Sequence, residues 1–361
     1  MIELAPFSGT YDPRDVEILL KPARIEPVDV ARKEALIQSG RRHYSEMLSA
    51  EALPDARYLA LYRQALERNA GRLRGDVEQL AAAIARRPET NESCVVISLA
   101  RAGTPIGVLL RRALARIGVA AHHYSISIIR DRGIDEVALA YIRERHGTGT
   151  AVFVDGWTGK GSIRGQLDRS LSAGATGFRP FLAVVADPAG CADLAATSED
   201  YVIPSGLLNG IVSGLISRSV LNDEVVGPGD FHACVFQTEH AAHDLSRSFI
   251  EDVEAAAVPA SGGTWSPEIA ARSRQRCQAL MAELMAEGGI DDPNRIKPGI
   301  AEATRALLRR VPHAVYLKDP GDPDVRHLVH LAREAGVPVV PRDLHNYRAV
   351  TVIRKIGGEQ E

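Results

Sequence analysis

One acidic residue and a loop of small residues follow an apolar run at 151–163, AVFVDGWTGKGSI. The apolar residues before Asp155 are typical of a buried strand. In the loop, Thr158 and Ser162 supply hydroxyl groups and Lys160 an ammonium group, while the glycines leave backbone N–H groups open to a ligand. If the loop turns directly into a helix, these donors suit a phosphate group. A plain turn capped by Ser162 is the alternative, and the ATP-binding pattern GxxxxGK[ST] is not met.

A second break of the same kind lies upstream at 97–110, ISLARAGTPIGVLL. It also runs from a β-branched segment through small residues into a helical pattern. The carboxyl ends of neighbouring parallel strands meet at one sheet edge, so Arg101 and Gly103 are expected near Asp155. Two loops suited to anions at one edge indicate a ligand with phosphate groups at both ends.

The elements around these loops must form a parallel sheet to bring them together. From Cys94 onward, short apolar runs alternate with helical patterns, which predicts an α/β fold with parallel strands covered on both faces. The predicted strands are 94–100, 122–129, 151–155 and 178–188. Residues 28–90 are predicted to be mostly helix because their apolar residues recur at three- and four-residue spacing.

A closely packed loop and helix are predicted over 199–220. One stripe of this helix carries small polar side chains at four-residue spacing: Ser205, Asn209, Ser213 and Ser217. Such a stripe indicates close packing of the helix on the sheet, or contact with a ligand. Arg218 follows it as an anion contact or a helix-end charge.

A length of 361 residues favours two domains. The small, uncharged segment 255–267 is the best linker candidate, and a second, smaller α/β pattern begins near Asn294. We therefore expect a helical extension, a Rossmann-like core, a linker with one helix, and a small α/β/α unit: residues 1–90, 91–255, 256–290 and 291–361.

The composition is globular, with 45% hydrophobic and 25% charged residues. Because the net charge is −3, any contact with nucleic acid has to be local. The four cysteines lack metal-ligand spacing and resemble the reduced thiols of a cytosolic protein. No window is apolar enough for a membrane span. The sequence thus predicts a cytoplasmic protein with no metal site of its own and no membrane contact, and leaves a homodimer open.

The segment VFVDGWTGKGS resembles the phosphoribosyl-diphosphate (PRPP) signature of type I phosphoribosyltransferases, and SLARAG at 98–103 looks like their pyrophosphate loop. The resemblance implies that Asp155 binds ribose hydroxyls. It implies that pyrophosphate, with Mg²⁺, is held by Arg101, Ala102 and Gly103. The 5′-phosphate would be held by Thr158, Gly159, Lys160, Gly161 and Ser162.

The stretch 130–145 takes the place of the flexible catalytic lid of that family, which implies catalytic roles for Arg130 and Arg132. One position departs from the family pattern. Gly156 stands where a second acid is expected, so the ribose and metal contacts are one carboxylate short. This departure bears on catalysis more than on PRPP binding.

Segments along the whole chain resemble one bacterial family, in which a phosphoribosyltransferase domain is joined to a PELOTA-like RNA-binding domain. These proteins belong to Ter (tellurite-resistance) stress gene clusters and are sometimes labelled cysteine proteases. The segments are SGTYDPRDVEILLK, KEALIQSGRRHYSEML, VDGWTGKGSI, IPSGLLNGIVSGLISRSV and IKPGIAEATRALLRRVP.

The C-terminal segment GIAEATRALLR resembles the helix signature of kink-turn-binding ribosomal proteins. The resemblance implies a local RNA-binding patch formed by Lys297, Glu302, Arg305 and Arg309. Ala301 replaces the asparagine of that signature, which argues against sequence-specific kink-turn recognition. A solvated helix face is the alternative.

Two further clusters have competing interpretations. His43, Tyr44 and Glu46 form either part of an acceptor-base pocket or a surface-facing helix. Cys191 could pair with a histidine as a protease nucleophile, with Asp187 nearby and these histidines downstream: His232, His240 and His243. No protease signature surrounds any cysteine.

The expected function is that of a phosphoribosyltransferase, which uses PRPP, or a nucleotide and pyrophosphate, with a base-like acceptor. RNA is the expected partner of the C-terminal domain. The alternative is a non-catalytic, RNA-binding sensor of PRPP or a nucleotide, which the missing second acid favours. A cysteine protease is a remote third interpretation.

Overall fold

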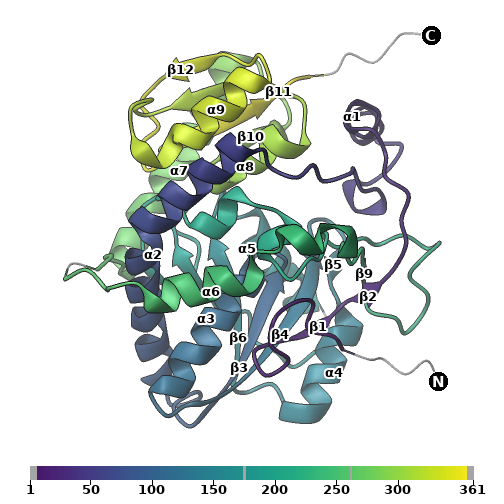
Figure 1. Cartoon of the computed structure of the whole chain (residues 1–361), viewed down its shortest axis with the longest axis vertical. Coiled ribbons are helices and arrows are strands. Elements are labelled where there is room, and N and C mark those ends of the chain that lie inside the picture. Colours follow the sequence, from purple (N-terminus) through teal and green to yellow (C-terminus); the bar gives the residue numbers. More distant parts are fainter. Residues whose placement is uncertain (1–5, 174–175, 261, 356–361) are drawn as a thin grey trace.

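The computed structural model describes residues 6–173, 176–260 and 262–355. The larger sheet has the strand order β1-β4-β3-β6-β7-β8, all parallel, with a short β5 antiparallel to β4 (Figure 1). This confirms the predicted parallel α/β sheet. Its strands are β1 (Glu17–Leu19), β3 (Ser93–Ala100), β4 (Ala120–Ile129), β5 (Gly133–Ile134), β6 (Ala151–Trp157), β7 (Leu182–Ala186) and β8 (Leu194–Thr197).

Helices cover both faces of this sheet. In β6, Val152 and Val154 pack in the cluster formed with α2 and α3, whereas Phe153 packs in the cluster on the opposite face, with α4 and α5. Strands covered on both faces are continuous apolar runs, which is why AVFV precedes the polar loop. The covering helices are α2 (Ala56–Ala85), α3 (Gly103–Arg116), α4 (Glu136–His146), α5 (Ser162–Ala173) and α6 (Ser246–Ala255).

The N-terminal segment is helical in α1 (Val30–Gln38) and α2, with a 3-10 turn, η1 (Tyr44–Glu46), between them. Before α1 the chain is extended. There, β1 forms an edge strand of the large sheet, and β2 (Lys21–Pro22) pairs with β9 (Ala233–Cys234).

The α-helix predicted within 199–220 does not form. The chain makes two 3-10 turns instead, η2 (Pro204–Leu207) and η3 (Gly210–Val212). Gly214 and Leu215 both have positive φ, 72° and 58°, which interrupts any helix. The predicted polar stripe is therefore wrong, although its three serines are buried in a packed loop and Asn209 is half-buried. A further 3-10 segment, η4 (Thr238–His243), precedes α6.

The C-terminal unit is a four-stranded sheet with the order β10-β13-β11-β12. It has helices on both faces: α8 and α9 pack on one, and α7 packs on the other through Cys277, Leu280 and Leu284. Among the described residues, no helix is long and apolar enough to cross a membrane. The elements are α7 (Pro267–Gly288), η5 (Pro293–Arg295), β10 (Ile296–Pro298), α8 (Ile300–Arg309), β11 (Pro312–Leu317), η6 (Pro323–Val325), α9 (Arg326–Glu334), β12 (Val339–Pro341) and β13 (Ala349–Ile353).

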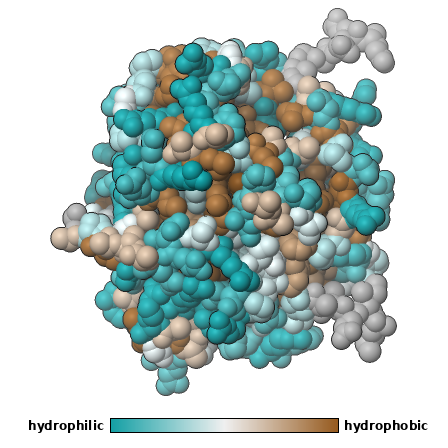
Figure 2. Space-filling view, in the orientation of Figure 1, coloured by the Kyte–Doolittle hydropathy of each residue, from teal (hydrophilic) through white to brown (hydrophobic). Residues whose placement is uncertain are grey.

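The two units are joined by buried polar contacts. The carboxylate of Asp200, beyond β8, accepts hydrogen bonds from the backbone N–H groups of Ile300 (3.0 Å) and Arg348 (2.8 Å). The long α2 reaches up to contact α9 (Figure 1). Figure 2 shows a mainly hydrophilic face, with hydrophobic residues gathered between the two units. As a result, α8 lies over the carboxyl edge of the large sheet.

Candidate anion-binding cavity

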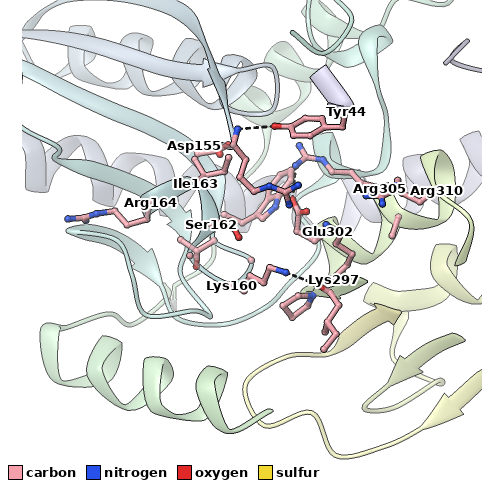
Figure 3. A pocket seen from close by; sticks show the side chains of 18 of the residues that line it. Tyr44, Asp155, Lys160, Ser162, Ile163, Arg164, Lys297, Glu302, Arg305 and Arg310 are labelled. Atoms are coloured by element: carbon pink, nitrogen blue, oxygen red, sulfur yellow. Dashed lines mark hydrogen bonds and ion pairs between the residues drawn. The ribbon is translucent and has the colours of Figure 1, made fainter. Parts of the chain in front are cut away.

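A cavity of about 310 Å³ lies between the loop after β6 and helix α8 (Figure 3). Parts of α1, η1 and β10 complete its walls. Two carboxylates, those of Asp155 and Glu302, line it together with nine cationic side chains, of which Arg130, Arg164 and Arg310 form ion pairs with acids outside the lining. The cations are Lys33, Arg130, Lys160, Arg164, Arg218, Lys297, Arg305, Arg309 and Arg310.

The loop after β6 presents free backbone donors to this cavity. Within the described residues, the N–H groups of Gly159, Lys160, Gly161 and Ser162 have no hydrogen-bond acceptor. Gly161 has φ of +84°, which allows the chain to turn directly into α5 at Ser162. Successive free N–H groups at a helix N-terminus form an anion-binding nest.

Thr158 differs from the other residues of the predicted phosphate loop because its hydroxyl is hydrogen-bonded within the fold. Its hydroxyl donates to Asp187 at 2.7 Å and accepts from the N–H of Ala189 at 3.1 Å. Trp265 in turn donates to Asp187 at 3.2 Å. The Thr158 hydroxyl therefore anchors the loop to the segment that follows β7 and is already engaged.

Two lysines lie beside the nest without a carboxylate partner. Burial, and then the charges of Lys297 and Arg130, lower the pKa of Lys160 to about 7. Its ammonium donates to the carbonyl oxygens of Pro293 and Ile296. Burial also lowers the pKa of Lys297 to about 8, despite the attraction of Glu302. Neither lysine forms an ion pair among the described residues, so both can respond to a bound anion.

Asp155 is the acid that the strand pattern predicts at the end of β6, and it lines the cavity. Burial raises its pKa to about 7, although Arg305 opposes the shift. One carboxylate oxygen accepts the N–H of Gly156 at 2.8 Å. The remaining lone pairs are available to hydroxyl groups of a ligand.

The residues predicted to bind RNA line this same cavity. Arg305 forms an ion pair with Glu302 at 2.8 Å and lies over the Trp157 ring. Arg309 donates to Asn209, and Lys297 faces Lys160 (Figure 3). The expected solvent-facing RNA patch is therefore a wall between the units, because α8 packs on the larger unit.

A group of cations occupies the side of the cavity away from the nest. Lys33 is only 4% exposed and has no side-chain partner among the described residues. Buried atoms of two neighbours, Arg218 Nη1 and Arg309 Nε, also lack a partner. Arg310 differs, because it pairs with the buried Glu34 at 2.7 Å. Sequence reasoning missed Lys33, whose only signal is a charge on the buried face of α1.

The predicted pyrophosphate loop does not line the cavity. Arg101 is buried in an ion pair with Glu51 at 2.6 Å and also donates to Asn209 at 3.1 Å. Burial disfavours the Glu51 carboxylate, but Arg101 and then Arg309 outweigh it and lower its pKa to about 2. A Cβ on Gly103 would lie 2.6 Å from the Val154 carbonyl oxygen, so Gly103 serves close packing. Ala102 lies between them at the start of α3.

The stretch 130–145 is not the flexible lid that the resemblance implies. Most of it is α4, which buries Ala138, Leu139 and Ile142 in the core. Only the beginning of the stretch, directly after β4, reaches the site. There Arg130 lines the cavity and donates to Asn294 at 2.8 Å. Arg132 instead pairs with Glu46 at 2.8 Å.

Of the predicted cluster at 43–46, likewise, only one residue reaches the cavity. Tyr44 lines the cavity, and its hydroxyl accepts the N–H of Arg130 at 2.9 Å. His43 bonds to Ser45 at 2.8 Å, and Glu46 is held by Arg132. The structure brings Tyr44 alone of the three into the cavity wall.

The four thiols lack the features of a protease nucleophile. Burial raises the pKa of Cys94, Cys191 and Cys234 to about 12, and for Cys191 the charge of Asp187 adds to the shift. Burial also raises the pKa of Cys277. None of the described histidines hydrogen-bonds a thiol, and His232 bonds to Ser127 instead at 2.8 Å.

Comparison with solved structures finds phosphoribosyltransferases at low similarity. The hypoxanthine phosphoribosyltransferase of Trypanosoma cruzi is 15% identical with a TM-score of 0.28, covering 37% of this chain and 82% of that one. An HGPRT-ase from Leishmania tarentolae in complex with GMP is 13% identical with a TM-score of 0.24, covering 41% and 84%. Scores this low carry no inference about function.

Sequence comparison is decisive. The family model described as "Tellurite-like stress resistance cysteine protease StiP" matches residues 9–254, and a PELOTA RNA binding domain model matches residues 275–355. A protein of Acinetobacter baylyi called "Cysteine protease StiP" is 45% identical over 367 aligned positions, which cover 97% of this chain and 95% of that protein. This chain therefore belongs to the StiP family of tellurite-like stress resistance proteins, with a PELOTA RNA-binding domain in its C-terminal part.

Proposed function

We propose that this chain binds a phosphorylated ribose compound, PRPP or a nucleotide, in the cavity and acts on it as a phosphoribosyltransferase-like enzyme. One observation carries the proposal. Free N–H groups at the start of α5 face two lysines, Lys160 and Lys297, that have no carboxylate partner. Charge-assisted hydrogen bonds to a phosphate group contribute about 1.5–3 kcal/mol each, so this arrangement suits a 5′-phosphate.

Asp155 supports the ribose part of the proposal. It belongs to the strand that leads into the nest and keeps lone pairs free for ribose hydroxyls. In the proposed transfer, the bond from C1 to the acceptor nitrogen forms while the bond to diphosphate breaks, and the proton of the acceptor nitrogen passes to solvent. An ionised Asp155 would stabilise positive charge at C1, and the cations would stabilise the departing diphosphate.

The residues of the cavity do not fit a protein-held Mg²⁺ ion. Its two carboxylates are those of Asp155 and Glu302, and Glu302 is already paired with Arg305. No group of three His, Cys, Asp or Glu residues in the described chain could hold a metal. Mg²⁺ would enter only with a diphosphate ligand, and no step is assigned to it.

A non-catalytic sensor of PRPP or a nucleotide is the second candidate. It is favoured by Gly156 in place of the second acid and by the engagement of Arg101 with Glu51. Gly156→Asp separates the two candidates, because a Cβ there would meet Ile106 only at an ordinary 3.7 Å. With PRPP and a panel of bases, an enzyme releases pyrophosphate in the wild type. A sensor binds PRPP without turnover, and only the Gly156→Asp variant gains activity.

RNA binding is proposed for the C-terminal unit, through a face other than α8. A second cavity of about 360 Å³ on this unit combines cations with an aromatic ring, which suit an RNA backbone and a stacked base. Its lining includes Arg295, Tyr316, Arg342, Arg354 and Lys355. Arg354→Ala is expected to weaken RNA binding and reduce its salt dependence, whereas Arg305→Ala leaves both unchanged. The reverse pattern would return the RNA site to α8.

The protease interpretation gains no support from the described residues. A cysteine nucleophile needs a neighbouring base or a lowered pKa. The thiols have neither, since burial raises the pKa of all four. The family description thus names an activity that the described thiols do not explain.

A further inference from the structure

The far side of the cavity holds charge that the fold does not neutralise. Lys33 is 4% exposed, lines the cavity and has no partner among the described side chains or carbonyl groups. Arg218 Nη1 and Arg309 Nε are buried and also unpartnered. Leaving a buried donor unsatisfied costs about 1–3 kcal/mol, and more when it is charged. Two such atoms lie beside Lys33, whose side chain also lines the cavity without an ion-pair partner among the described residues, so a ligand could compensate all three groups.

These cations repel one another. Burial, and then the charges of Arg218, Arg309 and Arg310, lower the pKa of Lys33 to about 8. Burial likewise lowers the pKa of Arg218 to about 10. The nearby acids compensate this charge only in part, since Glu34 pairs with Arg310 and Glu51 pairs with Arg101, although Glu34 also attracts Lys33 and Glu51 also attracts Arg218 and Arg309. A bound anion would relieve both the repulsion and the unsatisfied donors.

The cluster lies opposite the phosphate nest. Figure 3 shows Ser162 and Arg310 on opposite sides of the cavity, with Glu302 and Arg305 between them and Asp155 on the side of Ser162. Arg309 directly precedes Arg310 at the end of α8, and Arg218 lies over the Tyr44 ring at 5.5 Å from its centre, so both belong to the side of the cavity away from Ser162 and Lys160. The charges that act most strongly on Lys33 are those of Arg218, Arg309 and Arg310. A ligand that reaches both ends must therefore carry two anionic groups separated by its ribose.

We propose that Lys33, Arg218 and Arg309 form a second anion subsite, which takes a diphosphate or similar phosphate group at the far end of the ligand. The inference deepens the proposed function, because the same ligand would place its 5′-phosphate in the nest. It replaces Arg101 as the expected diphosphate contact. Phosphate carries about −1.5 to −2 at pH 7, so one or two such groups match three unpaired cations.

This subsite draws on three distant segments. Lys33 comes from α1, Arg218 from the loop after η3, and Arg309 from α8 of the PELOTA unit. Occupancy would therefore hold the PELOTA unit against the larger unit. The cations would be maintained for binding at a cost to the stability of the empty protein.

The test compares ribose 5-phosphate, PRPP and inorganic pyrophosphate by isothermal titration of the full chain, with Lys33→Met and the matched surface control Lys318→Met. We expect the wild type to bind PRPP at least about tenfold more tightly than ribose 5-phosphate, which is about 1.4 kcal/mol. Lys33→Met should lose that difference and its pyrophosphate binding, yet keep its affinity for ribose 5-phosphate. Lys318→Met should match the wild type.

Thermal unfolding separates binding from structure. Removing an unpaired buried charge should raise the melting temperature of the empty Lys33→Met variant. A lower melting temperature, or equal loss for all three ligands, would overturn the subsite. Pyrophosphate binding that depends on Lys33, without any binding of the ribose compounds, would leave the subsite standing and refute the proposed function. No binding of pyrophosphate or PRPP by the wild type would overturn the subsite.

Discussion

The guanidinium carbon of Arg305 lies 4.6 Å from the centre of the Trp157 ring. This contact joins α8 of the PELOTA unit to the last residue of β6. Trp157 follows Asp155, the residue proposed to bind the ribose, two positions later in the same strand. The helix whose charges suggest RNA binding in the sequence is thus a wall of the cavity, which both units line.

The Arg305–Trp157 contact should contribute measurably to holding the units together. A cation over an aromatic ring contributes about 0.5–2 kcal/mol, depending on burial. We expect a double-mutant cycle of Arg305→Ala and Trp157→Leu, which removes the aromatic ring, to give a coupling free energy of at least about 0.5 kcal/mol in urea unfolding. Arg326→Ala, at an exposed arginine on α9, is the matched control and should show no coupling with Trp157→Leu. Strict additivity at Arg305 would refute the contact.

Asp155 should make the stability of the empty protein fall as the pH rises from about 4 to 7. Its folded pKa of about 7 lies above the ordinary carboxyl value of 3.8, so the folded state binds more protons in that range. The stabilisation that the protonated Asp155 carboxyl gives the folded state is present below about pH 4 and is lost as the pH rises through about 7. Asp155→Asn, which cannot ionise, should remove this decline. The measurement is the free energy of unfolding of both proteins between about pH 5 and 8, and parallel curves would contradict the raised pKa.

Lys160 should link phosphate binding to pH. Its folded pKa of about 7 means that the empty site loses this charge near neutrality, while a bound phosphate favours the charged form. The affinity for ribose 5-phosphate should therefore fall from about pH 6 to 9 in the wild type, and more steeply than in Lys160→Met. The variant should also bind at least about tenfold more weakly at about pH 6, since one charge-assisted hydrogen bond contributes about 1.5–3 kcal/mol. Equal affinities at that pH would exclude Lys160 from the site.

Much of this arrangement could be predicted from local sequence patterns. The apolar run before Asp155 predicted β6, and the glycines after it predicted a loop with open N–H groups. What local patterns cannot show is the docking of the two units. Arg305 and Arg309 have the spacing of a solvated helix face, and only tertiary packing turns that face into the cavity. Lys33 was missed for the same reason, because its burial depends on segments distant in the chain.

The prediction of a helix within 199–220 was wrong for a different physical reason. Four-residue spacing of small polar residues matches a helix, but backbone conformations at Gly214 and Leu215 are left-handed. The ion pair of Arg101 could not be predicted either, because the sequence shows its loop and not its partner. Glu51, fifty residues earlier, neutralises it in the fold.

The thiols should be inert, including that of Cys191, which is only partly buried and lines the cavity. Because burial raises the pKa of Cys191 to about 12, its reaction with iodoacetamide at about pH 8 should be much slower than that of free cysteine. Cys191→Ala should keep the wild-type affinity for ribose 5-phosphate. Fast modification that abolishes a proteolytic activity of the wild type would instead support the protease name of the family.

The central claim is tested most directly by a crystal structure of the full chain grown with ribose 5-phosphate. The account predicts the phosphate within hydrogen-bonding distance of the N–H groups of Gly159 to Ser162, with the ribose hydroxyls against Asp155. A ribose 5-phosphate bound elsewhere, with the nest left to solvent at saturating ligand, would contradict it.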